Sequence, residues 1–244
     1  MDKVEPMTVV IVHFNTPKLT RAAVMSLWKH TPGCRVVVFD NSDRLSVKDS
    51  AVWQELLKSP LVSVIDNTHG QVIDFESWLE GFADREPSPR NNYGSAKHCW
   101  SVQWLCDCLG EPFLLMDSDV LVRQDVTEFF RHPECAWVGE IGENVRRRFG
   151  YTFQKVQPFL CWLNVPLMRE MGISYFNGEW MWNLTSIRPN HRYDTGAWFY
   201  KAVNEKGLPV YEVTLKEYIL HLGHGSWKDR RPMEWVREHR GLWE

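Results

Sequence analysis

The chain has 244 residues, of which 44% are hydrophobic, and its formal net charge at pH 7 is −3. This length fits one large soluble domain or two small ones, and the charge excludes a general nucleic-acid binder. No stretch approaches the roughly 18 apolar residues that a membrane-spanning helix needs. The six cysteines include no C-x-x-C pair, which excludes the common zinc and redox motifs and indicates buried thiols in a reducing compartment.

The short, charged start of the chain does not resemble a signal peptide. We therefore expect a cytoplasmic protein whose contact with a membrane is at most peripheral. The sequence contains 13 tryptophans, a number that suits a protein binding sugars on flat apolar faces. This inference is weak, because aromatic residues also fill protein cores.

The chain opens with a predicted β-α-β unit. Met7 to Val12 is an apolar, β-branched run that predicts a strand, and His13-Phe14-Asn15 follows it. Lys18 to about His30 carries apolar residues at helical spacing, and Arg35 to Phe39 predicts the second strand. Two strands joined through a helix are parallel. Asp40 then stands at a strand end, where it either hydrogen-bonds a nucleobase or ribose or serves as a capping or turn acid.

The alternation of helices and strands continues to the middle of the chain. We expect a short helix over Val52–Leu57, a strand over Leu61–Ile65, an amphipathic helix over Asp74–Ala83, a surface loop or flap over Arg85–Asn92 and a helix over Ala96–Leu109. Lys97 and His98 fall in the first turn of the last helix and can point toward the sheet edge. A lysine there opposes the helix dipole, which indicates either a nearby anion or a solvated side chain.

The stretch from Glu111 to Val122 organises the chain. Four apolar residues lead into Asp117-Ser118-Asp119, and more apolar residues follow. A short apolar run bounded by turn signals predicts a strand buried on both faces, central and parallel, and ligands bind at the carboxyl ends of such strands. Two carboxylates this close repel unless a cation neutralises them, and Mg²⁺ is commonly held by carboxylates together with substrate phosphates. The alternative is an ordinary helix cap or turn.

After Asp119 the regular alternation ends. The expected elements are strands over Ala136–Gly139, Phe159–Asn164, Val210–Val213 and Tyr218–Leu220, a solvated or anion-facing loop over Glu143–Tyr151, a short helix from Pro166, an aromatic pocket wall over Met171–Asn190, and a helix capped by Asp194-Thr195-Gly196 that runs to about Glu205. His221-Leu222-Gly223-His224 follows the last strand, and Lys228 to Glu244 forms a basic tail. Acids at strand ends, a D-x-D and a late histidine together fit a metal-bound nucleoside diphosphate.

These motifs resemble the nucleotide-sugar glycosyltransferases of the GT-A fold, of the family-2 kind. The resemblance covers nearly the whole chain and is carried by Val9–His30, Val36–Ser42, Phe113–Asp119, Asp194-Thr195-Gly196 and His221–Trp227. It implies an α/β fold with a Rossmann-like, mostly parallel central sheet flanked by helices and a small acceptor-side extension. It also implies a single glycosyltransferase domain, with a nucleotide-binding half over 1–122 and an acceptor-binding half and tail over 123–244.

The resemblance also implies roles for particular residues. The D-x-D residues Asp117, Ser118 and Asp119 would contact ribose and metal, and His221 or His224 would complete the shell of Mn²⁺ or Mg²⁺. The same comparison implies donor contacts at His13, Asn15, Asp40 and Lys97, with Lys97 or His98 in place of the family's usual Ala-Arg-Asn helix start. Asp194 holds the place of the catalytic base, although Tyr193-Asp194 replaces the family's frequent Glu-Asp.

We therefore expect metal-dependent transfer of a sugar from a nucleoside-diphosphate sugar to a hydroxyl of a saccharide or lipid-linked saccharide, in bacterial-type surface glycan synthesis. Three alternatives stay open at this point. A haloacid-dehalogenase-like phosphatase also carries a D-x-D after an apolar strand, although there it usually follows the first strand. The other two are a nucleotidyltransferase on a similar fold and, outside enzymes, a sugar-binding module favoured by the tryptophan content.

Overall fold

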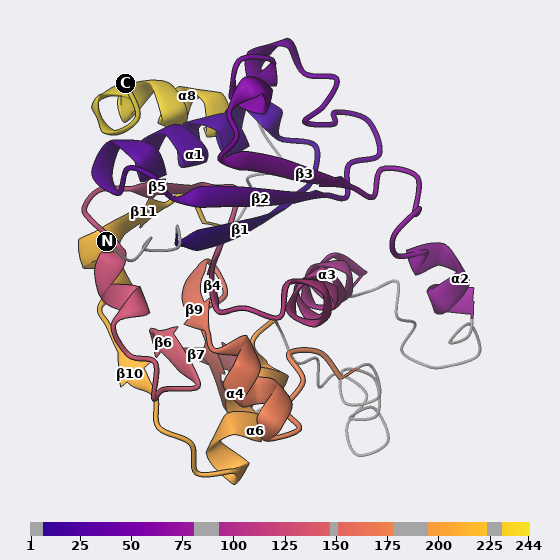
Figure 1. The fold of residues 1–244 in the computed structure, drawn as a ribbon, viewed down its shortest axis with the longest axis vertical. Coiled ribbons are helices and arrows are strands. Elements are labelled where there is room, and N and C mark those ends of the chain that lie inside the picture. Colours follow the sequence, from indigo (N-terminus) through magenta and orange to yellow (C-terminus); the bar gives the residue numbers. More distant parts are fainter. Residues whose placement is uncertain (1–6, 81–92, 147–150, 178–194, 224–230) are drawn as a thin grey trace.

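A seven-stranded sheet forms the centre of the structure, a computed structural model that describes residues 7–80, 93–146, 151–177, 195–223 and 231–244 (Figure 1). The strand order is β10-β6-β9-β4-β1-β2-β3. The strands are β1 (Thr8–His13), β2 (Arg35–Asp40), β3 (Val62–Asp66), β4 (Phe113–Met116), β6 (Trp137–Gly139), β9 (Leu160–Leu163) and β10 (Tyr211–Glu212). Four neighbouring pairs are parallel, and β9 runs antiparallel to both β4 and β6. The predicted mostly parallel α/β sheet is confirmed.

Helices cover both faces of this sheet, with α1 on one side and α3, α4 and α6 on the other (Figure 1). The helices are α1 (Pro17–His30), α2 (Phe75–Glu80), α3 (Tyr93–Leu109), α4 (Val165–Glu170), α6 (Ala197–Glu205), α7 (Leu215–Tyr218) and α8 (Arg231–Glu238). Short 3₁₀ turns are η1 (Ala51–Trp53), η2 (Leu56–Lys58), η4 (Thr127–Phe130) and η7 (Arg240–Leu242). Within the described ranges, no helix combines the length and apolar character needed to cross a bilayer.

The alternation of side chains along β4 divides the interior into two cores. Phe113 and Leu115 pack with α3 and α4, whereas Leu114 and Met116 pack with α1, and all four side chains are fully buried. A strand that buries both of its faces shows a continuous apolar sequence because successive side chains point to opposite sides. The prediction of a buried central strand is therefore confirmed, with one parallel neighbour, β1, and one antiparallel neighbour, β9.

Two small sheets flank the large one. In the first, β5 (Val120–Val122) pairs antiparallel with β11 (Ile219–His221), so the chain leaves the central sheet at Asp117-Ser118-Asp119 and enters a second sheet directly afterwards. The second is a hairpin of β7 (Ile141–Arg146) and β8 (Tyr151–Val156). Asp117-Ser118-Asp119 thus connects two sheets, and the strand pairing in these sheets holds the chain on both sides of the motif.

Two local predictions were wrong. The ends of the loop expected over Glu143–Tyr151 are instead strand, since β7 runs to Arg146 and β8 begins at Tyr151, while residues 147–150 lie outside the described part of the chain. The single helix expected over Val52–Leu57 is two separate one-turn 3₁₀ helices, a form common in connections. Trp53 fixes this connection, since it is fully buried and its Nε1 donates to the Pro17 carbonyl over 2.7 Å.

Candidate active site

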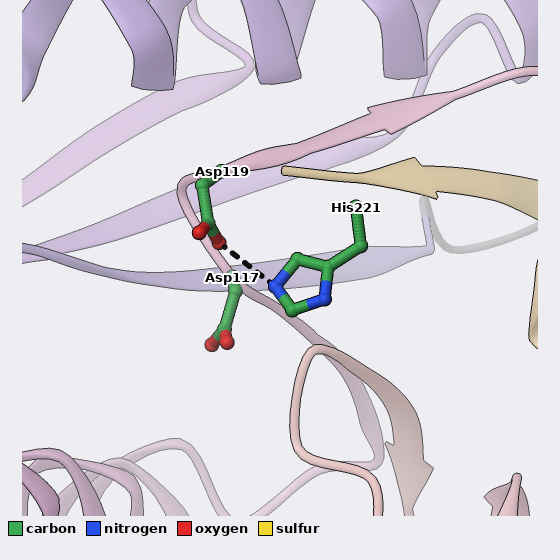
Figure 2. Close-up of side chains that lie close together, drawn as sticks. All are labelled: Asp117, Asp119 and His221. Atoms are coloured by element: carbon green, nitrogen blue, oxygen red, sulfur yellow. Dashed lines mark ion pairs between the residues drawn. The ribbon is translucent and has the colours of Figure 1, made fainter. Parts of the chain in front are cut away.

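Asp117, Asp119 and His221 meet at the carboxyl end of β4 (Figure 2). Each residue offers one ligand atom, and these atoms all lie within 4.8 Å of one another. His221 Nε2 lies 3.3 Å from Asp119 Oδ1. Asp119 is buried, and Asp117 and His221 are partly open to solvent. The site is therefore formed by two residues that follow β4 and one from β11, close to the end of the chain.

Backbone contacts hold these residues in place. The N–H of Asp117 donates to the Phe159 carbonyl over 3.0 Å, and the N–H of Leu222 donates to the Asp119 carbonyl over the same distance. The ring of Phe159 stacks on His221 with 4.3 Å between ring centroids. The main chain on both sides of the three side chains is thus fixed by its neighbours, which pre-positions the ligand atoms.

A second histidine contacts the site from α3. His98 Nε2 lies 3.2 Å from Asp117 Oδ1. Burial lowers the pKa of His98, but the adjacent carboxylate of Asp117, together with Cys99, outweighs burial and raises that pKa to about 10. Each carboxylate of the D-x-D therefore has an imidazole beside it, which relieves the repulsion between the two acids.

The same contacts shift the pKa values of the other groups. Burial acts to raise the pKa of Asp117, but the hydrogen bond and charge of His98, with the charges of His221 and Lys155, lower it overall. For His221, burial acts to lower the pKa, and the hydrogen bond and charge of Asp119 raise it overall. Asp117 is therefore ionised at neutral pH, as a metal ligand must be.

This donor set fits a divalent cation. Two carboxylates and one imidazole are oxygen and nitrogen donors of the kind that Mn²⁺ accepts, and carboxylates also suit Mg²⁺. A proton on His221 would have to leave before the imidazole could bind a metal, so binding would release it. Ser118, between the two acids, is partly exposed.

His13, Asn15 and Asp40 form a second group at the ends of β1 and β2. His13 is fully buried, with Nδ1 2.7 Å from Thr20 Oγ1 and Nε2 4.0 Å from Asp40 Oδ1, and burial lowers its pKa despite the charge of Asp40. Asp40 accepts backbone N–H groups from Ser42 and Val47. Both side chains thus hold the loop after β2. Their contact with a nucleotide-sugar donor stays a prediction.

Asn15 and Lys97 lie on the more open side of this group. Asn15 has a left-handed backbone, with φ of 55°, and its side-chain oxygen accepts the N–H groups of Arg44 and Leu45. The ammonium of Lys97 lies over the rings of Phe14, at 5.5 Å, and Phe75, at 5.0 Å. Burial lowers the pKa of Lys97, and the charges of Asp43 and Glu76 oppose that shift. Lys97 therefore belongs with the β1 and β2 loops.

Two predicted site residues fall outside the described parts of the chain. These are Asp194, the predicted base, and His224, the alternative metal ligand. Of the two histidines proposed as metal ligands, His221 falls within the described residues and lies beside the D-x-D.

A cavity of about 690 Å³ opens beside His221, lined by residues of β10, α7 and β11. Phe159 and His221 form one wall, and the buried side chains of Leu215 and Ile219 contribute apolar surface. Charged residues also line it, namely Arg123, Glu140, Glu212 and Lys216. The Glu140 carboxylate is held by the N–H of Leu215 over 2.7 Å. Every residue that lines this cavity comes from the second half of the chain, after the D-x-D.

Sequence reasoning missed three contributors to the site. The contact of His98 with Asp117 was not predicted, although His98 was expected in the first turn of the helix before the D-x-D and near the sheet edge. Lys155 acts through its charge on Asp117 and His221, and no motif singles it out. Phe159 directly precedes β9, the strand that pairs with β4. Its position beside the D-x-D follows from the register of that pair, which the sequence does not reveal.

Comparison with known proteins supports the fold. No family model and no curated protein sequence matches the chain. Among solved structures, the galactosyltransferase LgtC, in complex with donor and acceptor sugar analogues, is 15% identical over 86% of this chain and 74% of its own, with a TM-score of 0.55. Mouse xyloside xylosyltransferase 1, in its apo form, is 12% identical over 86% of this chain and 85% of its own, with a TM-score of 0.53.

At such low identity these likenesses establish the fold alone. The chain has the GT-A type of fold found in glycosyltransferases, with a mostly parallel sheet flanked by helices. The GT-A resemblance stated from the sequence is confirmed at this level.

Proposed function

We propose that the protein is a metal-dependent glycosyltransferase that moves a sugar from a nucleoside-diphosphate sugar to a hydroxyl of a saccharide acceptor. The observation that carries this proposal is the meeting of Asp117, Asp119 and His221 at the carboxyl end of β4, within a GT-A type of fold. In α/β sheets, ligands bind in the crevice at this edge.

Asp117, Asp119 and His221 would hold the cation, which neutralises charge on the leaving diphosphate. The exposed surface near Asn15 and Lys97, at the ends of β1 and β2, is our proposed place for the nucleoside. Lys97 contributes a positive charge there, and the exposed ring of Phe14 offers an apolar face. Asp194 stays our proposed base for the acceptor hydroxyl, on the basis of sequence.

The cavity beside His221 is our proposed acceptor site. It is adjacent to the metal-binding residues, and it combines apolar surface from Leu215 and Ile219 with charged groups such as Arg123 and Glu212. Sugars present apolar C–H faces together with hydroxyl groups, so a site of this mixed character suits them. A lipid-linked acceptor and a role in surface glycan synthesis stay predictions.

A reducing, cytoplasmic location is supported by the cysteines. All six are free thiols, and five of them are buried. Disulfides persist mainly in oxidising compartments, so buried free thiols fit a reducing one.

Thermal shift assays with a panel of nucleoside diphosphates test the proposal. A ligand that binds the native state raises the melting temperature by mass action. We expect one nucleotide to raise it in Mn²⁺ and much less in EDTA, and Asp119→Asn to lose that difference. Glu205→Gln, at an exposed helix end, is the control and should behave as the parent.

Hydrolysis of the matching nucleotide sugar would then separate this proposal from a phosphatase, a nucleotidyltransferase or a sugar-binding module. We expect slow, Mn²⁺-dependent release of the free sugar and the nucleoside diphosphate. Equal nucleotide binding in Mn²⁺ and in EDTA would contradict the proposal.

A further inference from the structure

We propose that His98 is a positioning residue that holds the Asp117 carboxylate in the orientation required to bind the divalent cation. The inference rests on the metal site of the proposed function. It starts from the 3.2 Å contact between His98 Nε2 and Asp117 Oδ1. The three mutually close ligand atoms belong to Asp117, Asp119 and His221, so His98 lies outside the ligand set.

The two His–Asp pairs of the site have different roles. His221 pairs with Asp119 and is itself in the ligand set, so a cation would replace the contact between them. His98 pairs with Asp117 from α3 and lies outside the ligand set, so a cation held by the other three residues need not replace this contact. The His98 pair can therefore persist when the site is loaded.

The position of His98 is rigid. Its immediate neighbour Cys99 is buried, as are Ala96 and Val102 on the same helix, and these side chains belong to the core under the sheet. The imidazole itself is mostly buried, with 19% of its side-chain surface exposed. An imidazole fixed in this way, in ion-pair contact with the carboxylate, limits the rotation of the Asp117 side chain, whose backbone is already held by the Phe159 carbonyl.

Partners of this kind matter for metal affinity. Groups that hydrogen-bond to ligating carboxylates orient them, and their loss typically weakens metal binding about 10–100-fold. If His98 acted only through its charge, its removal would instead increase the metal affinity, because the two acids would attract a cation more strongly without a positive neighbour. The direction of the change in affinity therefore distinguishes positioning from charge.

The test measures Mn²⁺ affinity of the nucleotide-free protein by electron paramagnetic resonance of the free ion. In His98→Leu the contact is lost, and we expect the Mn²⁺ dissociation constant to rise about 10–100-fold. His98→Gln places a polar N–H group at similar reach of the carboxylate and should stay within about threefold of the parent. His98→Asn, too short to reach Oδ1, should resemble His98→Leu and serves if the leucine variant does not fold.

His132→Leu is the matched control. His132 Nε2 also lies 3.3 Å from a carboxylate, that of Glu128, and has 17% of its side chain exposed, but it is not in the ligand set. This variant should bind Mn²⁺ as the parent does. Melting temperatures in EDTA, measured for every variant, report the structural cost of each change separately.

Unchanged or tighter Mn²⁺ binding in folded His98→Leu or His98→Asn would overturn the proposal and leave the metal site intact. Failure of the metal site itself gives a different result, because the parent and Asp119→Asn would then bind Mn²⁺ equally weakly, and both inferences would be wrong.

Discussion

His221 reaches Asp119 because of the register between β11 and β5. His221 is paired with Val120, the residue directly after Asp119, and its Nε2 lies 3.3 Å from the Asp119 carboxylate. A shift of one residue in this register would turn the histidine to the other face of the small sheet. The proposed metal site therefore depends on a strand pair between distant parts of the chain.

Replacement of His221 by Ala should remove one of the three proposed metal ligands. We expect Mn²⁺-dependent nucleotide binding to weaken at least as much as the roughly 10–100-fold seen when outer partners are lost. Isothermal titration with nucleotide at fixed Mn²⁺ measures this change. His239→Ala, on the C-terminal segment, should match the parent, and a His221→Ala variant with unchanged affinity would exclude His221 from the site.

The buried His13 should make stability fall in acid. Burial lowers its pKa in the folded state, so the unfolded chain binds more protons in the window between the folded value and the ordinary value of 6.5. Its contribution is complete above pH 6.5 and is lost as the pH falls through the folded pKa. Urea denaturation at pH 7.5 and 5.5 should show a smaller acid loss for His13→Gln than for the parent.

His69→Gln, at an exposed position, is the control for this comparison. It should show the same acid loss as the parent. An identical pH dependence in His13→Gln would assign the loss to other groups.

Asn15 should stabilise the loops after β1 and β2 in two separable ways. Its side chain accepts two backbone N–H groups, and its backbone has the left-handed conformation. Asn15→Gly keeps that backbone and loses these two hydrogen bonds and a third, which Asn15 Nδ2 donates to Asp43, each of which is worth about 0.5–1.5 kcal/mol. Asn15→Ala should lose a further 1–2 kcal/mol or so, because a Cβ disfavours this region. Equal unfolding free energies for the two variants would show that the backbone is not strained.

Gly196 should tolerate no side chain at the start of α6. Its φ is 85°, and a Cβ there would lie 2.2 Å from the carbonyl oxygen of Val156 on β8. Gly207 also has a positive φ, of 62°, but has open space around it. Gly207→Ala should therefore cost about 1–2 kcal/mol of unfolding free energy, and Gly196→Ala should exceed that by about 1–3 kcal/mol. Similar costs for the two would place the strain in the backbone alone.

Asp194 is predicted to be the general base. Asn caps a helix as well as Asp does but cannot accept a proton. Asp194→Asn should therefore leave the melting temperature and nucleotide binding unchanged and lower turnover by roughly 10²–10⁴-fold. Turnover within a few-fold of the parent would make Asp194 a helix cap and move the search to Glu179.

The sequence predicted best those helices and strands whose residue pattern depends on their own burial. The continuous apolar run before Asp117 indicated a strand buried on both faces, and β4 is such a strand. The β-α-β unit, the helix before the D-x-D and the late strand before His221 were each present within a few residues of their predicted ends. The β7–β8 hairpin was not predicted, because the charged and polar residues over Glu143–Arg148 show no clear period of two.

Contacts between elements were beyond the sequence. The approach of His98 to Asp117 depends on how α3 is rotated against the sheet, which is decided by the packing of residues such as Val102 and Leu105. The burial of Asp40 likewise depends on the loop that folds back to donate the N–H of Val47. A strand-end acid looks the same in sequence whether a ligand or a backbone amide is its partner.

The β5–β11 pair also constrains the order in which the protein can be completed during synthesis. The β-α-β unit at the start of the chain can pair its strands early, because β1 and β2 are joined by a single helix. β5 gains its partner strand only after Ile219–His221 has left the ribosome, and until then the edge of β5 is unpaired. The three residues of the proposed metal site consequently come together only after β11 has been synthesised, so a nascent chain that stops before His221 would lack one of the proposed ligands.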